Sequence, residues 1–165
     1  RQHRWRSPKD PFKRTVETKI APAEAALKDL HREDVCAGKK VVLSAVPGAY
    51  TPTCHLKHLP GFIDSAEAFK KKGVQTVACV AVNDPFVLDT WSKATGGQGR
   101  VLFLSDGNAE FTKKIGLDFD GSGIGLGTRS KRYAMLVDDG VVKALNIQDS
   151  PGVAEASASR GACLH

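Results

Sequence analysis

Three short apolar runs, separated by segments with helical periodicity, constrain the fold more than any other feature of the sequence. Runs of this length, rich in valine and leucine, predict strands that are buried on both faces of a sheet. Between the first two runs, apolar residues recur at three- and four-residue spacing, which predicts a helix that Gly73 ends. The runs lie at residues 39–46, 74–82 and 101–106.

Two further helices are predicted from their end signals. Asn83-Asp84-Pro85 follows the second run and predicts an N-cap with proline at the first helical position. After the third run, Asn108 is the predicted cap of a short helix that ends before Gly116. Strands and helices therefore alternate through this part of the chain.

A hairpin closes the alternation. Residues 132–147 contain two apolar segments around Asp139-Gly140, a strong hairpin signal. Strand–helix alternation followed by a hairpin predicts an α/β fold of three layers, with a mixed central sheet and helices on both faces. This order is that of the thioredoxin-like fold, although other three-layer α/β folds would also fit it.

The charge is unevenly distributed along the 165 residues. Of a net charge of +6, most comes from residues 1–14, which hold six basic residues and one acidic residue. Such an arm can bind nucleic acid or anionic lipid, but the rest shows no basic stripe, so we interpret it as a tail or a targeting remnant. We predict a basic, weakly organised segment at 1–34 and one folded domain at 35–165. No apolar run is long enough to span a membrane, so we expect neither a membrane nor a nucleic-acid partner.

The four cysteines are scattered and form no C-x-x-C pair. For a chain of this size, that pattern does not predict a secreted disulfide scaffold. A reducing compartment with one or two functional thiols fits better. The cysteines are Cys36, Cys54, Cys79 and Cys163.

Cys54 follows a predicted helix start. Thr51 and Pro52 suit the N-cap and the first helical position, so Cys54 falls at the third. Unpaired backbone N–H groups and the positive end of the helix dipole stabilise a thiolate there, and the thiolate is the nucleophile. Thr51 could hold a small oxygen-containing substrate, and Pro47 could shield the pocket from water. The alternative is that Cys54 is a small buried residue that happens to begin a helix.

The stretch PGAYTPTC, residues 47–54, resembles the active-site motif of the peroxiredoxins, which are thiol peroxidases with a thioredoxin-like fold. Further stretches resemble the type II, or atypical two-cysteine, branch in its plant form. Together the similar stretches cover residues 39–147. They are KHLPGF, VNDPF, LFLSDGNAEFTKKIGLD and GLGTRSKRYAMLVDDGVVKALN.

The resemblance implies roles for four residues. Cys54 would be the peroxidatic cysteine, which attacks a peroxide O–O bond and becomes a sulfenic acid. Thr51 would hydrogen-bond the peroxide, Pro47 would shield the pocket, and Arg132 would stabilise the thiolate and the charge developing on oxygen. Taken without the resemblance, Arg132 would be a solvated cation at a strand end. No cofactor and no metal are implied.

The resemblance also implies that a second thiol resolves the sulfenic acid. Cys79 matches the resolving cysteine proposed for plant-type members, but in an apolar strand it could equally be a core residue. Cys163 is the candidate for the animal-type pattern, although its surroundings do not match that pattern. A one-cysteine cycle, in which glutaredoxin or a small thiol attacks Cys54, is the third possibility.

Expected partners follow from the same resemblance. The substrates would be hydrogen peroxide and alkyl hydroperoxides, and the reductant would be glutaredoxin with glutathione, or thioredoxin. A homodimer is expected, as is a role in redox homeostasis and defence against oxidative stress. The compartment would be intracellular: the cytoplasm, a plastid or a mitochondrion.

Alternative functions remain open at this stage. They are a thiol–disulfide oxidoreductase, which the absent C-x-x-C disfavours, a redox-sensing binding protein, and a nucleic-acid-binding module that uses the basic arm. A metal site at Cys54, His55 and His58 would need ligands from elsewhere. Ser44 departs from the family pattern, because a hydroxyl in a buried strand needs a hydrogen-bond partner.

Overall fold

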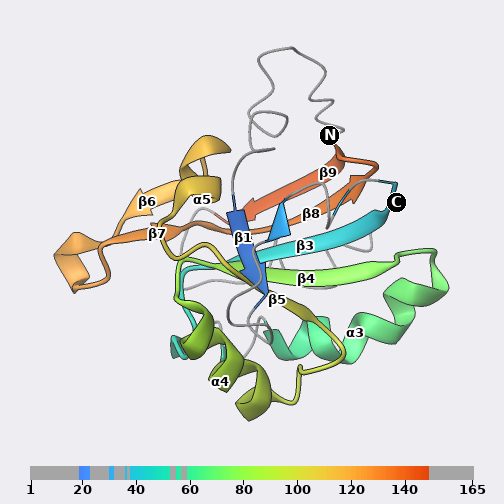
Figure 1. The fold of residues 1–165 in the computed structure, drawn as a ribbon, viewed down its shortest axis with the longest axis horizontal. Coiled ribbons are helices and arrows are strands. Elements are labelled where there is room, and N and C mark those ends of the chain that lie inside the picture. Colours follow the sequence, from blue (N-terminus) through green and yellow to red (C-terminus); the bar gives the residue numbers. More distant parts are fainter. Residues whose placement is uncertain are drawn as a thin grey trace.

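The computed structural model describes residues 19–22, 30–31, 36, 38–52, 55–56 and 59–148, and for 19–22 and 30–31 it describes the backbone alone. Within these residues the fold is α/β, and the predicted mixed sheet between helical layers is confirmed. Figure 1 shows α3 and α4 on one side of the sheet and α5 on the other.

The main sheet has the strand order β2-β1-β5-β4-β3-β8-β9. Strands β3, β4 and β5 run parallel to one another, whereas β1 and β8 are antiparallel to their neighbours β5 and β3. The parallel strands are the three apolar runs. Their bounds are Lys40–Val46 (β3), Thr76–Ala81 (β4) and Leu102–Ser105 (β5); the others are Lys19–Pro22 (β1), Leu30–His31 (β2), Arg132–Asp138 (β8) and Val141–Gln148 (β9).

Two cores lie on opposite faces of the sheet. Helices α3 (Leu59–Lys71) and α4 (Pro85–Thr95) cover one face with Phe62, Phe69 and Trp91, among others. Helix α5 (Glu110–Lys114) covers the other face, where Phe111 packs with alternate residues of β3, β4 and β8. Alternation of side chains between the faces of each strand makes both cores from the same strands.

The predicted ends of α3 and α4 are confirmed. Gly73 has φ +86°, and the bonds from Gly73 N to Lys70 O and from Val74 N to Phe69 O complete a Schellman ending after α3. At the start of α4, the Asp84 carboxylate accepts a hydrogen bond from Val87 N at 2.9 Å, and Pro85 occupies the first turn. These local signals fix where each helix meets the sheet.

The cap predicted for α5 was wrong. The residue before the helix is Ala109, with φ +56°, and Asn108 makes no capping bond. Instead, the Asp106 carboxylate accepts hydrogen bonds from Phe111 N at 3.1 Å and Thr112 N at 2.8 Å. Asp106 directly follows β5 and is almost fully buried. The residue at the strand end therefore caps α5 in place of Asn108.

The hairpin prediction is confirmed. Asp139 and Gly140 have φ of +47° and +72°, as a two-residue turn with both centres in the left-handed region requires. A register shift between Leu136 and Val137 interrupts the pairing of β8 with β9. The hairpin places β8 beside β3, which sets the position of Arg132.

Four short strands were not predicted. Strands β1 and β2 lie before residue 35, in the segment predicted to be weakly organised, yet β1 pairs with β5 at the sheet edge. Strands β6 (Asp118–Asp120) and β7 (Thr128–Ser130) form a separate two-stranded sheet. Strand pairing therefore begins before residue 35, while the division into segments at 1–34 and 35–165 stays a prediction, as does the basic arm at 1–14, which lies outside the described residues.

Candidate active site

The loop after β3 carries the predicted site residues Pro47 and Thr51. Pro47 and Gly48 are buried, and Ala49 N donates to Asn83 Oδ1 at 2.9 Å, which ties the loop to the residues that follow β4. Tyr50 has φ +61°, a strained conformation for a bulky residue. The loop is thus held in one shape at the carboxyl end of the parallel strands.

The helix start after Thr51 is where the sequence predicts it. Pro52 has helical backbone, and His55 N donates to Thr51 O at 2.9 Å. The Thr51 hydroxyl donates to Gly48 O at 2.8 Å, so its only hydrogen is already used and its lone pairs remain available as acceptors. Cys54, the predicted nucleophile, lies outside the described residues, as do His58 and Cys163.

Arg132 is buried, not solvated. It begins β8, and only 1% of its surface is exposed. The neighbouring pair in the antiparallel ladder is Ala45 with Tyr133, so Arg132 lies at the end of β3 that leads into Pro47. The alternative of a solvated strand-end cation is therefore wrong. A buried guanidinium is costly unless it serves polar or anionic groups, and this one lies at the predicted site.

A second arginine, Arg129, was missed by the sequence interpretation. Its Nε donates to Leu126 O at 2.8 Å, and its Nη1 donates to Val82 O at 3.2 Å and lies 3.5 Å from Pro47 O. A Cβ added at Gly48 would come within 2.9 Å of Nη1. Arg129 thus joins the Pro47 loop, the end of β4 and the glycine-rich loop. The sequence did offer a signal for Arg129: it lies three residues before Arg132, within the same stretch that resembles the peroxiredoxins.

Cys79 is a core residue in this structure. It lies within β4, opposite Ser44 on β3 and Phe103 on β5, and is 1% exposed. Its side chain belongs to the core that α3 and α4 cover. Cys36 is also buried, and neither forms a disulfide with a described residue. A reaction of Cys79 with another thiol therefore requires local opening of the structure.

The hydroxyl of Ser44 has the partner that burial demands. Ser44 is fully buried, and its Oγ donates to Ala78 O on β4 at 3.2 Å. The departure from the family pattern at this position is therefore accommodated within the sheet.

Burial alters two titratable groups near the site. It raises the pKa of the Asp106 carboxyl above its ordinary value, although hydrogen bonds from Thr112 and Phe111 act in the opposite direction. Burial, followed by the nearby Asp106 charge, raises the pKa of Tyr133 well above its ordinary value, so this phenol is neutral. A cavity of about 650 Å³ lies beside Asp106 and is lined by residues 82–85, Ser105 to Asn108, Glu110 and Arg129.

Two other expectations concern metals and membranes. Among the described residues, no group of three or more His, Cys, Asp or Glu side chains is placed to hold a metal ion. The metal alternative at Cys54, His55 and His58 is not tested by this, because two of its ligands are not described. Within the same part of the chain, no helix has the length and apolar character to cross a membrane.

Comparisons with known proteins agree with the fold. The Redoxin family matches residues 11–160. Peroxiredoxin-2E, chloroplastic, of Arabidopsis thaliana is 47% identical over 84% of this chain and 60% of its own length. Peroxiredoxin-2E-2, chloroplastic, of Oryza sativa subsp. japonica is 51% identical over 83% of this chain and 62% of its own length. The chain thus spans about three fifths of each of these relatives. Reduced Prx3 from Vibrio vulnificus, in complex with hydrogen peroxide, superposes with a TM-score of 0.80 at 44% identity, covering 87% of this chain and 90% of that one.

Proposed function

Because the chain belongs to the peroxiredoxin family, in its type II branch, we propose that it is a thiol-dependent peroxidase that reduces hydrogen peroxide and alkyl hydroperoxides through a sulfenic acid at Cys54. The observation that carries the proposal is the burial of Arg132 beside the end of β3 that leads into Pro47 and Thr51. A buried cation at this position would stabilise an anionic sulfur that forms beside it.

In the proposed reaction, the Cys54 thiolate attacks one oxygen of the peroxide and the O–O bond breaks. The sulfur gains an S–O bond and is oxidised to the sulfenic acid, while the departing oxygen takes up a proton and leaves as water or an alcohol. Arg132 stabilises the thiolate and the negative charge that develops on the departing oxygen. Pro47 is buried in the loop and offers no N–H group, and it excludes water from the pocket around Cys54.

The hydrogen bond of Thr51 supports a part for this residue in peroxide binding. Since the hydroxyl donates to Gly48 O, Oγ1 faces a substrate as an acceptor and would take the O–H of the peroxide. An acceptor at this position favours the protonated peroxide over its anion. The protonated form is the one whose departing oxygen leaves as water or an alcohol once it has taken up a proton. The Arg129 guanidinium lies against this loop, close enough to Gly48 that a side chain there would meet it.

In the second half of the cycle, a thiol attacks the sulfenic sulfur, and a disulfide and water are formed. We propose Cys79 as the resolving cysteine, with local opening to expose it, and thioredoxin, or glutaredoxin with glutathione, as the reductant. The burial of Cys79 makes the opening step a requirement of this route. A direct attack on Cys54 by the external thiol needs no such exposure of β4.

We also propose a homodimer formed through the face that carries the site. Large apolar side chains are exposed there: Tyr50 on the loop, Leu56 two residues after Cys54, and Phe86 in the first turn of α4, with exposures of 47%, 69% and 67%. Exposed apolar groups of this size are typical of interfaces.

For the compartment we propose an organelle, since two of the relatives are named chloroplastic and another, from Arabidopsis thaliana, is named mitochondrial.

Steady-state peroxide consumption tests the proposal. Wild type, Cys54→Ser and Cys79→Ser are compared with each donor, thioredoxin or glutaredoxin with glutathione. We expect no activity from Cys54→Ser and a slower cycle for Cys79→Ser with thioredoxin alone. Unaltered activity of Cys79→Ser with both donors would exclude Cys79 as the resolving thiol. Undiminished activity of Cys54→Ser would exclude the proposed reaction.

A further inference from the structure

Three aromatic rings connect the turn that follows Thr51 to helix α4. Trp91 Nε1 donates to His55 Nδ1 at 3.0 Å, across 36 residues of sequence. The Tyr50 ring stacks on the His55 ring, with centroids 5.6 Å apart and planes 24° apart, and lies 6.5 Å from the Trp91 ring. We call Tyr50, His55 and Trp91 the ring anchor.

Trp91 is the fixed end of the ring anchor. Its side chain is fully buried in the core, and its indole meets the Phe103 ring of β5 edge-on at 5.7 Å. An indole N–H can only donate, and a buried one that lacks an acceptor is unfavourable. His55 supplies that acceptor, so the packing of Trp91 favours the position of His55 seen here.

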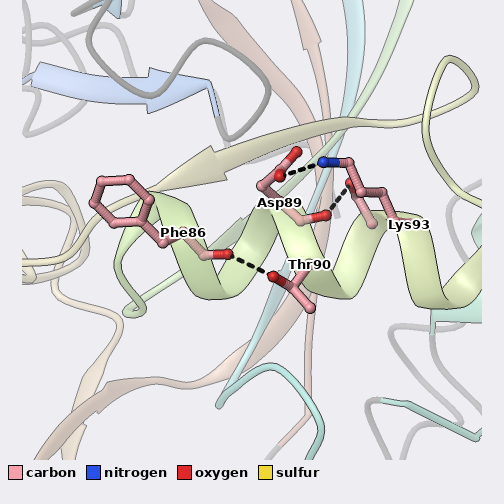
Figure 2. Close-up of polar contacts among 5 residues, drawn as sticks. Phe86, Asp89, Thr90 and Lys93 are labelled. Carbon is pink, nitrogen blue, oxygen red and sulfur yellow. Dashed lines mark hydrogen bonds and ion pairs between the residues drawn. The ribbon is translucent and has the colours of Figure 1, made fainter.

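Within the part of the chain that the structure describes, the exposed side of α4 makes no comparable link. Figure 2 shows that Thr90 Oγ1 donates to Phe86 O and that Lys93 Nζ pairs with Asp89, so these polar groups bond within the helix itself. Among the described residues, Trp91 is the α4 residue whose side chain hydrogen-bonds to the turn beside Cys54. Thr90, its neighbour on the exposed side, therefore provides a matched control position.

His55 stands at a position where this link has consequences for the chemistry. It is joined by a peptide bond to Cys54, and its own N–H bonds to Thr51 O at 2.9 Å. It belongs to neither PGAYTPTC nor KHLPGF, the two stretches on either side of it that resemble the peroxiredoxins. Loss of the side-chain hydrogen bond would therefore loosen the turn without removing a residue of the proposed reaction.

We propose that His55 is a positioning residue: through the ring anchor it holds the turn next to Cys54 closed, and it thereby limits how fast a second thiol reaches the sulfenic acid. This inference rests on the proposed function. Opening of the turn must break the His55–Trp91 bond as well as the backbone bond to Thr51. Removal of the side-chain bond raises the open population about fivefold, the factor that corresponds to one ordinary hydrogen bond.

Four variants of the full chain separate the hydrogen bond from other effects. His55→Phe keeps a ring against Tyr50 but removes the acceptor, and Trp91→Phe removes the donor. His55→Asn places an amide oxygen near the position of Nδ1 and should rescue the bond. Thr90→Ala changes the exposed side of α4 only. In a proton–nitrogen NMR spectrum, the Trp91 indole signal, identified by its loss in Trp91→Phe, should shift in His55→Phe and return toward the wild-type position in His55→Asn.

Two rates provide the decisive test. The first is hydrogen exchange of the residue-55 amide, corrected for intrinsic rate and compared with amides of β8 as a measure of global stability. The second is the loss of the sulfenic acid to a disulfide after one equivalent of hydrogen peroxide. We expect both to rise by the same factor, about fivefold, in His55→Phe and Trp91→Phe. His55→Asn and Thr90→Ala should stay close to wild type, and the peroxide step itself should be unaltered.

Three outcomes would count against the inference or its premise. Unchanged exchange in both His55→Phe and Trp91→Phe would show that the ring anchor does not hold the turn. Faster exchange with an unaltered rate of sulfenic acid loss would show that the anchor does not limit the cycle. Failure of the proposed function would appear differently, as no peroxide loss by wild type while the exchange differences persist, and would overturn the role in the cycle but not the anchor.

Discussion

Replacement of Arg129 by methionine should weaken the link between the glycine-rich loop at Leu126 and the residue that follows β4, Val82. The guanidinium makes two hydrogen bonds of good length, from Nε to Leu126 O at 2.8 Å and from Nη1 to Val82 O at 3.2 Å. The approach of Nη1 to Pro47 O, at 3.5 Å, is at the limit for a hydrogen bond and adds little. Methionine keeps an unbranched apolar stem and removes every donor.

The magnitude follows from these two bonds. A hydrogen bond with a charged donor contributes about 1.5–3 kcal/mol. Arg129 is half-buried, so water reaches part of the site and hydrates a freed carbonyl. We therefore take less than the sum and expect Arg129→Met to lose about 2 kcal/mol of unfolding free energy. For a domain of this size, that corresponds to a Tm lower by roughly 4–8 °C.

Urea unfolding followed by circular dichroism provides the measurement. Arg129→Lys should fall between wild type and Arg129→Met, because an ammonium reaches one carbonyl but lacks the planar fork of donors. Lys131→Met, an exposed neighbour, is the matched control for loss of charge. A loss below about 0.5 kcal/mol in Arg129→Met, the size of an ordinary surface substitution, would refute the role assigned to Arg129.

Three further substitutions test the packing and the electrostatics. The raised pKa of Asp106 means that the folded chain holds this proton more tightly than the unfolded chain, so its contribution to stability is present below pH 3.8 and is lost as the pH rises through the folded-state pKa. The unfolding free energy of wild type minus that of Asp106→Asn should therefore fall with rising pH, and a rise would contradict the sign. Gly97→Ala should destabilise by about 1–3 kcal/mol because its Cβ would lie 2.8 Å from the Phe103 ring, whereas Gly123→Ala, with open space around it, should change the melting temperature little. Ser44→Ala should lose about 1 kcal/mol in urea unfolding through its buried hydrogen bond, and an increase in stability would count against that bond.

The elements that could be predicted from sequence are those whose own residues determine them. The parallel strands are continuous apolar runs, and Asp84-Pro85 and Asp139-Gly140 act through local backbone geometry. Strands β1, β2, β6 and β7 are short and lack a clear apolar alternation, so their pairing depends on partners elsewhere in the chain. Asn108 has a residue type that suits a cap. The N–H groups of the first turn of α5, however, donate to the Asp106 carboxylate.

The candidate site was less predictable, because its groups meet only in the folded chain. Residue type predicted an exposed Arg132, whereas the antiparallel pairing of β8 with β3 buries it. The bond between His55 and Trp91 joins residues 36 positions apart and has no local signal. The resemblance to a family supplied Arg132, but neither Arg129 nor His55 was assigned a role by it.

Trapping of the sulfenic acid tests the central claim most directly. The reduced chain is treated with one equivalent of hydrogen peroxide in the presence of dimedone, and the labelled peptides are identified by mass spectrometry, with Cys54→Ser as the control. We expect an adduct on Cys54, in larger yield in Cys79→Ser, where the proposed resolving thiol no longer competes with dimedone, and none on the buried Cys36 and Cys79, together with loss of the peroxide. Peroxide that persists with no adduct on Cys54, or an adduct that forms on another cysteine while Cys54 stays reduced, would contradict the account.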